Sequence, residues 1–133
     1  MSESAAPKFS KEERIVSRRL IETLFGGGNS RSMAAFPLRL VYMPIERSGN
    51  TAAVQVLISV SKRHFKRAVK RNRVKRQIRE AYRLNKQSLV EALQVMPDKA
   101  LALAFIWQSD ELYSSAAVTA SMKVLLDRVA EKL

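Results

Sequence analysis

The sequence predicts an α+β fold, a two-layer sandwich in which helices pack on one small mixed sheet of about four strands. Hydrophobic residues make up 47% of the chain, enough for a packed core. Apolar residues alternate along residues 36–43 and 51–60, as in strands, and recur at helical spacing along residues 115–133. At 133 residues the chain fits a single domain, and the expected order of elements is α-β-β-β-α-β-α.

The first helix is expected to start at Ser10, which forms a Ser-x-x-Glu capping box with Glu13. The run Gly26–Asn29 should end it, because glycine and asparagine accept the left-handed backbone of a helix C-terminus. These glycines favour a loop over a phosphate-binding motif, which would follow a strand and precede a helix. Residues 1–8 are expected to form a disordered tail, which leaves residues 9–133 as the domain. The apolar residues at helical spacing are Ile15, Val16, Leu20 and Leu24.

Alternation assigns the strands to their faces. Residues 36–43 predict a half-buried strand in which Arg39 is among the residues facing away from the core. Its core-facing residues would be Phe36, Leu38, Leu40 and Tyr42. A short strand before Phe36 has no pattern of its own. The next strand would bury Val54, Val56, Ile58 and Val60. The nearly continuous apolar run Leu101–Trp107 predicts a central strand covered on both faces.

Two apolar segments predict further helices. A short one is expected around Leu89–Val95, before a break at Pro97-Asp98. The segment from about Ser115 predicts an amphipathic helix that closes the core. Its apolar positions are Val118, Met122, Leu125, Val129 and Leu133.

Positive charge is concentrated in one segment. The net charge is +12, and residues 62–83 hold eleven Lys or Arg and one acid, a net of +10. The remaining residues include 13 basic and 11 acidic ones. Such a concentration is typical of a nucleic-acid-binding surface. The lack of cysteine excludes disulfides and thiolate metal sites. Neither a secretory signal nor an apolar run near the ~20 residues of a membrane span is present, so a cytoplasmic protein is expected.

The basic segment predicts a helix with two unlike faces, given about 100° of rotation per residue. The apolar side consists of Val74, Ile78, Ala81 and, less closely, Tyr82. The opposite side carries Asn72, Arg76, Arg79 and Arg83, flanked by Arg73 and Lys75. Solvated helix faces usually alternate charge sign, so this stacking of like charge favours a polyanion-binding face. Asn72 suits either a contact with a nucleotide or a helix-capping role, and the pattern leaves both open.

The run RNRVKRQIRE, Arg71–Glu80, closely resembles the signature of the bacterial ribonuclease P protein family. Upstream, Ser59–Arg63 resembles the family's strand ending in Ser-x-Ser-Lys-Lys, and the likeness continues through Ala68-Val69 to Tyr82-Arg83. Weaker similarity extends over about residues 9–130. The specific part of the resemblance is the segment 59–83.

The resemblance implies a division of labour between RNA and protein. The catalyst would be an RNA that uses Mg²⁺, held mainly by RNA, to release the mature 5′ end of tRNA. The protein would carry no catalytic or metal-binding residue, and its partners would be that RNA and precursor tRNA, not membrane or DNA. The residues implied to contact the catalytic RNA are Arg71, Asn72, Arg73, Lys75, Arg76, Arg79 and Arg83. The 5′ leader would lie in a cleft between the sheet and the first helix, lined by Ile21, Phe25, Leu40, Tyr42, Ser59, Ser61 and Lys62.

Two features depart from the family pattern. Ile21 stands where the family commonly has an aromatic residue, so contact there would be apolar only. The link His64–Arg67 is bulkier and one residue longer than the family's glycine-containing link. The family also implies a left-handed β-α-β crossover, whereas handedness statistics alone favour a right-handed one.

The residues themselves offer no catalytic set. His64 has no partner cysteine and is expected at the surface, and Asp110-Glu111 lacks the spacing of a helical metal pair. An alternative function is a ribosomal or chaperone-like protein that binds structured RNA with the same helix. A membrane-surface role is disfavoured, because the apolar stripe is narrow and lacks Trp or Phe anchors.

Overall fold

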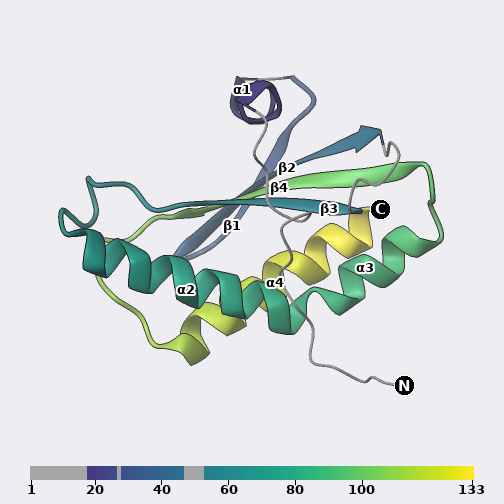
Figure 1. Cartoon of the computed structure of the whole chain (residues 1–133). Coiled ribbons are helices and arrows are strands. Elements are labelled where there is room, and N and C mark those ends of the chain that lie inside the picture. Colours follow the sequence, from purple (N-terminus) through teal and green to yellow (C-terminus); the bar gives the residue numbers. More distant parts are fainter. Residues whose placement is uncertain (1–17, 27, 47–52) are drawn as a thin grey trace, which may run out of the picture.

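The computed structural model describes residues 18–26, 28–46 and 53–133, and it confirms the α+β fold. Its elements are α1 (Arg18–Gly26), β1 (Arg31–Ala35), β2 (Leu38–Glu46), β3 (Val54–Ser59), α2 (Ala68–Asn85), α3 (Gln87–Gln94), β4 (Lys99–Trp107) and α4 (Ser115–Lys132). Figure 1 shows α2, α3 and α4 on one face of the sheet and α1 alone on the other. No helix in the described ranges is long and apolar enough to cross a membrane.

The four strands form one mixed sheet in the order β1-β2-β4-β3. The pairs β1–β2 and β2–β4 are antiparallel, whereas β3 and β4 are parallel. A parallel pair cannot be joined by a hairpin, and here the connection runs through α2 and α3. The expected β-α-β crossover is therefore confirmed, while its left-handed sense stays an expectation from the family.

Strand β4 lies inside the sheet and is buried on both faces, as its apolar run predicts. Leu101, Leu103, Phe105 and Trp107 enter the main core, which α2, α3 and α4 cover. Ala102 and Ala104 point to the other face, into a smaller core beneath α1. Their short side chains leave room for Leu24 of α1 and for Val41 and Met43 of β2, which complete this second core.

The prediction of a half-buried strand at residues 36–43 is wrong in two respects. Leu38, Leu40 and Tyr42 do enter the main core, but Val41 and Met43 are also buried, because α1 covers part of the second face. Phe36 is 64% exposed and lies before the strand, not in it. Pro37 lacks the N–H donor that a strand residue needs, so β2 begins after it, and the Phe36 ring instead packs edge-on against Tyr113.

The helices lie close to their predicted positions. α1 ends at Gly26 as expected, whereas its predicted start at Ser10–Glu13, the residues Ile15 and Val16 and the predicted 1–8 tail lie outside the described residues. α3 buries Leu89 and Leu93, and β1 is the short strand that no pattern supported. In α4 the predicted apolar positions are buried except Leu133, which follows the last helical turn and is 40% exposed.

Candidate RNA-binding surface

The orientation of α2 is set by its apolar stripe. Val74, Ile78, Ala81 and Tyr82 are all buried in the main core, which confirms the predicted docking face. Tyr82 packs against Phe105 of β4, with ring centroids 5.9 Å apart. Because these residues hold one side of the helix against the sheet, the opposite side faces solvent.

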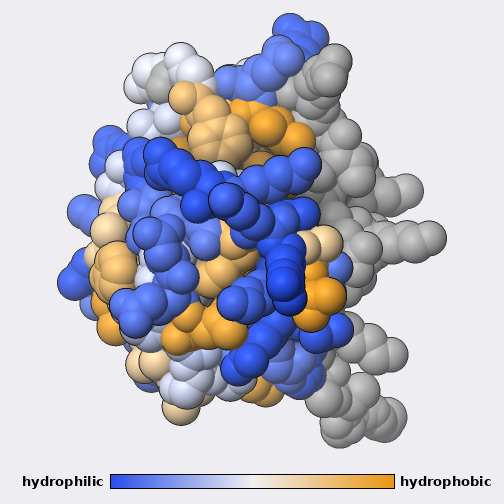
Figure 2. Space-filling model, turned by 90° about the vertical axis from the view of Figure 1, so that its left-hand side faces the viewer, coloured by the Kyte–Doolittle hydropathy of each residue, from blue (hydrophilic) through white to orange (hydrophobic). Residues whose placement is uncertain are grey.

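The solvent side carries the cationic row. Asn72, Arg73 and Arg76 are exposed, while Lys75, Arg79 and Arg83 are half-buried. Further exposed cations extend the row toward β3, at Lys70 in the first turn of α2 and at Lys62, Arg63, Lys66 and Arg67 in the loop before it. Figure 2 shows the result as a band of strongly hydrophilic side chains, with apolar surface between this band and the upper edge where α1 lies. Seven residues predicted from the signature thus lie on one helix, but not all on its open face.

Asn72 lies in the exposed row of α2, whereas the neighbouring Arg71 contacts the loop before the helix. α2 begins at Ala68, so Asn72 lies in its second turn, and the helix-capping interpretation of Asn72 is wrong. Arg71 projects toward the loop, where its Nη1 donates to the carbonyl oxygens of Phe65 and Lys66, at 2.8 Å each. Arg71 therefore supports the entry to α2 as well as adding charge there.

The bulky link before α2 forms an ordered turn. The carbonyl of Ser61 accepts from the backbone N–H groups of His64 (3.1 Å) and Phe65 (3.3 Å), and its hydroxyl accepts from the N–H of Arg63 (3.0 Å). Phe65 is only 5% exposed and anchors the turn in the main core. His64, expected at the surface, is only partly exposed. Its side chain is 12% exposed, and Nδ1 lies 2.7 Å from a carboxylate oxygen of Asp110.

The N-terminus of α2 adds to the positive potential. Its first turn holds no acidic residue, and the N-cap residue Arg67 makes no side-chain capping bond. Free N–H groups and the helix dipole already favour anions at a helix N-terminus, and Lys70 and Arg71 add full charges there. Helices usually place acids in this turn, so the arrangement destabilises the isolated helix and attracts phosphate.

The row contains one acid, Glu80, which pairs with Arg83. The hydrogen bond from Arg83 lowers the pKa of the Glu80 carboxyl, and the same bond raises the pKa of the Arg83 guanidinium. Both groups therefore stay charged at neutral pH. Arg83 is already engaged by a carboxylate, so it has less capacity for phosphate than Arg76 or Arg79.

The predicted leader cleft is only partly assembled. Leu40 and Tyr42 belong to the main core, on the face of the sheet opposite α1, so they cannot line a cleft between α1 and the sheet. Side chains alternate along a strand, and the β2 residue that points toward α1 is Val41. On the α1 side, Ile21 packs partly against the smaller core, and Phe25 is 48% exposed.

The surface beside α1 has other members. Ser59 is half-buried at the end of β3 and pairs in register with Ile106, which packs with Leu57 against the smaller core. Ser61 and Lys62 follow, both exposed. We call this set the α1 face: Ile21, Phe25, Leu57, Ser59, Ile106 and Lys62. Leu57 and Ile106 were missed by the sequence analysis, although they hold the alternate positions of two strands already recognised.

The described residues do not fit a metal ion. They contain no group of three or more His, Cys, Asp or Glu side chains that could hold one. His64 and Asp110 form a pair without a third ligand of these types.

Comparison with known proteins identifies the family of this chain. The ribonuclease P family model matches residues 9–129. Two curated relatives from strains of Porphyromonas gingivalis, each named ribonuclease P protein component, are 43% and 45% identical to this chain. The first alignment covers 98% of this chain and 92% of the relative, and the second covers 91% and 85%.

Solved structures give the same result for the fold. The ribonuclease P protein of Thermotoga maritima superposes with a TM-score of 0.64 at 21% identity, over 87% of this chain and 96% of its own. The ribonuclease P protein of Staphylococcus aureus superposes with a TM-score of 0.52 at 16% identity, over 88% of this chain and 94% of its own. Together with the family model and the two close relatives, they show that this chain belongs to the ribonuclease P protein family.

Proposed function

We propose that this chain is the protein subunit of ribonuclease P, that α2 binds the catalytic RNA, and that the α1 face contacts the 5′ leader of precursor tRNA. The observation that carries the proposal is the cationic row on α2, which faces solvent because the opposite stripe is buried in the core. Cleavage of the precursor in the cytoplasm, which frees the mature 5′ end, is assigned to the RNA subunit.

The geometry of α2 supports binding to an RNA backbone. Its 18 residues extend about 27 Å along the helix axis, long enough to follow several phosphates. Arg76 and Arg79 lie one turn apart on the open side, and guanidinium groups contact phosphate oxygens in pairs. Asn72, in the same row, can donate to or accept from a sugar or a base.

The α1 face suits a single strand better than a duplex. Phe25 offers an exposed ring on which a base can stack, and Ile21 offers apolar contact beside it. Lys62 supplies charge for the RNA backbone, and Ser59 supplies a hydroxyl group; the hydroxyl of Ser61, next to this face, already accepts from the N–H of Arg63. Phe25 is the one aromatic residue in the described part of α1, so stacking there is limited to one platform. Such contacts tolerate varied leader sequences.

Magnesium is assigned to the RNA in this proposal. The described residues offer no carboxylate cluster, whereas Mg²⁺ is commonly held by phosphate oxygens and water. The protein's contribution would be to neutralise phosphate charge. RNA that is less self-repelling should then fold and bind substrate with fewer free cations.

Adding this protein to its cognate RNA should raise 5′ cleavage of precursor tRNA at low magnesium. The positive row would replace part of the cation atmosphere that the RNA otherwise requires. The measurement is the cleavage rate against magnesium concentration, with and without protein. A chain that binds the RNA yet leaves the magnesium requirement unchanged would instead fit the alternative, a general structured-RNA-binding protein.

Arg76→Ala should weaken binding of the catalytic RNA and reduce the slope of log affinity against log salt by about 0.7–0.9, the share of one phosphate contact. Filter binding at several salt concentrations measures both. Lys123→Ala is the matched control, because Lys123 is a cation on α4 outside the basic segment. Equal losses in the two variants would show that only overall charge matters.

Phe25→Ala should reduce the preference of the holoenzyme for leader-bearing over leaderless tRNA, by about fivefold or more if one base stacks there. The ratio of the two dissociation constants is the readout. Phe36→Ala is the control, since Phe36 is also an exposed phenylalanine but lies between β1 and β2, away from α1. If both variants retain the wild-type ratio, the leader does not contact the α1 face.

A further inference from the structure

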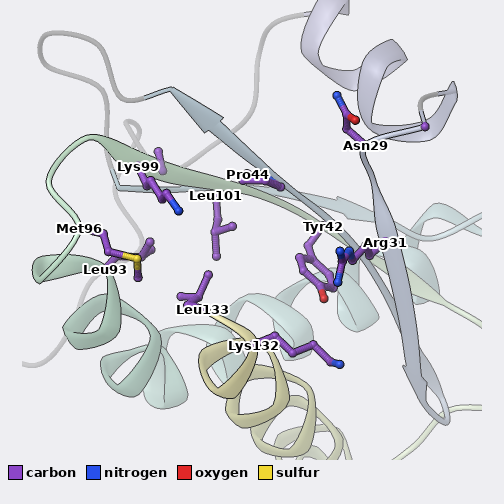
Figure 3. Close-up of a pocket in the computed structure, with 12 residues that line it drawn as sticks. Asn29, Arg31, Tyr42, Pro44, Leu93, Met96, Lys99, Leu101, Lys132 and Leu133 are labelled. Carbon is purple, nitrogen blue, oxygen red and sulfur yellow. The ribbon is translucent and has the colours of Figure 1, made fainter.

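A pocket of about 460 Å³ opens on the α4 side of the sheet, away from the α1 face. Figure 3 shows its wall assembled from the start of β1, the middle of β2, the α3–β4 turn and the C-terminal end of α4. Its volume falls within the range of small-molecule sites, roughly 300–1,000 Å³. The proposed functions of α2 and the α1 face make no use of this pocket.

The wall has a cationic part and an apolar part. Arg31, Lys99 and Lys132 contribute three positive charges, and no acidic residue is among its lining residues in the described part of the chain. Glu46 and Asp98 line an adjoining hollow that shares Pro44 and Lys99 with this pocket, so Arg31 and Lys132 are the cations that lie away from these acids. Pro44, Met96 and Leu133 form the accessible apolar part, while Leu93 and Leu101, each 1% exposed, close its floor. A ligand that fits should combine an anionic group with an apolar body.

Tyr42 adds a directed polar group. Its residue is 6% exposed because the ring is part of the main core, yet Figure 3 shows the hydroxyl pointing into the pocket between Arg31 and Lys132. Within the described ranges, the side chains of Tyr42, Arg31, Lys99 and Lys132 make no hydrogen bond or ion pair with the protein. The Tyr42 ring is buried, whereas its hydroxyl is open to the pocket. Here the hydroxyl and two cations converge on the same empty space.

We propose that this pocket binds a nucleoside monophosphate unit, independently of the RNA-binding role of α2. The phosphate lies between Arg31 and Lys132 and accepts a hydrogen bond from the Tyr42 hydroxyl. The base lies against Met96 and Leu133, above the floor formed by Leu93 and Leu101. A phosphate alone would leave the apolar part unused, and an apolar molecule alone would leave the charges of Arg31 and Lys132 unmatched.

The first test is titration of the full-length chain with adenosine 5′-monophosphate, followed by calorimetry and by methyl signals of Leu93 and Leu101. Adenosine and inorganic phosphate serve as the two half-ligands. Saturable binding of the nucleotide, tighter than either half-ligand and shifting these methyl groups, is the expected result. Equal binding of inorganic phosphate, or shifts confined to α2, would overturn the proposal.

Variants then test the named contacts. Tyr42→Phe keeps the buried ring and should weaken nucleotide binding about three- to tenfold, and Arg31→Ala should weaken it about tenfold or more. Lys123→Ala, a cation on α4 outside the pocket, should leave the affinity unchanged. Circular dichroism establishes that each variant is folded. Unchanged affinity in folded Tyr42→Phe and Arg31→Ala would exclude the site.

A final comparison identifies the source of the nucleotide. A single-stranded tetranucleotide that shifts the same methyl groups and binds more tightly than the mononucleotide would indicate a strand of RNA. If the tetranucleotide binds the pocket no more tightly than the mononucleotide does, the ligand of the pocket is a free nucleotide. If no nucleotide binds the pocket, the predicted results of the cleavage and leader experiments do not change. Those experiments test contacts on α2 and on the α1 face.

Discussion

The burial of one side of α2 is the constraint on which the rest of the molecule depends. Val74, Ile78 and Tyr82 fix the helix against the sheet, and this contact determines which side chains face solvent. Gln77 secures the flank, donating to the carbonyl of Tyr113 at 3.0 Å and to the hydroxyl of Ser115 at 3.2 Å, next to the start of α4. The helix is therefore held by apolar contact and by hydrogen bonds of Gln77, and neither uses the charges of Arg73 and Arg76.

Those charges work against the stability of the free protein. Arg79 faces Lys75 and Arg83 one turn away in each direction, and Arg76 lies nearby on the same side. Like charges at this spacing destabilise a helix by about 0.2–0.5 kcal/mol per pair. The helix N-terminus adds to the repulsion, since it holds cations where acids are favourable. A polyanion relieves both effects at once, which gives a physical reason for the whole segment and not only for individual contacts.

Periodicity predicted the apolar face of α2 correctly, because 3.6 residues per turn fix the angles once the helix exists. Periodicity could not determine on which face of the sheet the apolar residues of a strand lie. Leu40 and Tyr42 were expected beside α1, and the structure places them in the main core. An apolar strand residue does not reveal which of two covered faces it occupies, and here both Tyr42 and its neighbour Val41 are buried. The pairing of His64 with Asp110 was equally hidden, since it joins residues far apart in sequence.

The central claim, that the row on α2 is kept for a polyanion at the expense of stability, is tested most directly with Arg79→Gln. Urea unfolding at low and at high salt, together with affinity for the catalytic RNA, gives both quantities. The account predicts a variant that is about 1 kcal/mol more stable than the wild type at low salt, with a smaller difference at high salt, and that binds RNA more weakly. A variant that is less stable at low salt and binds RNA as tightly would contradict it.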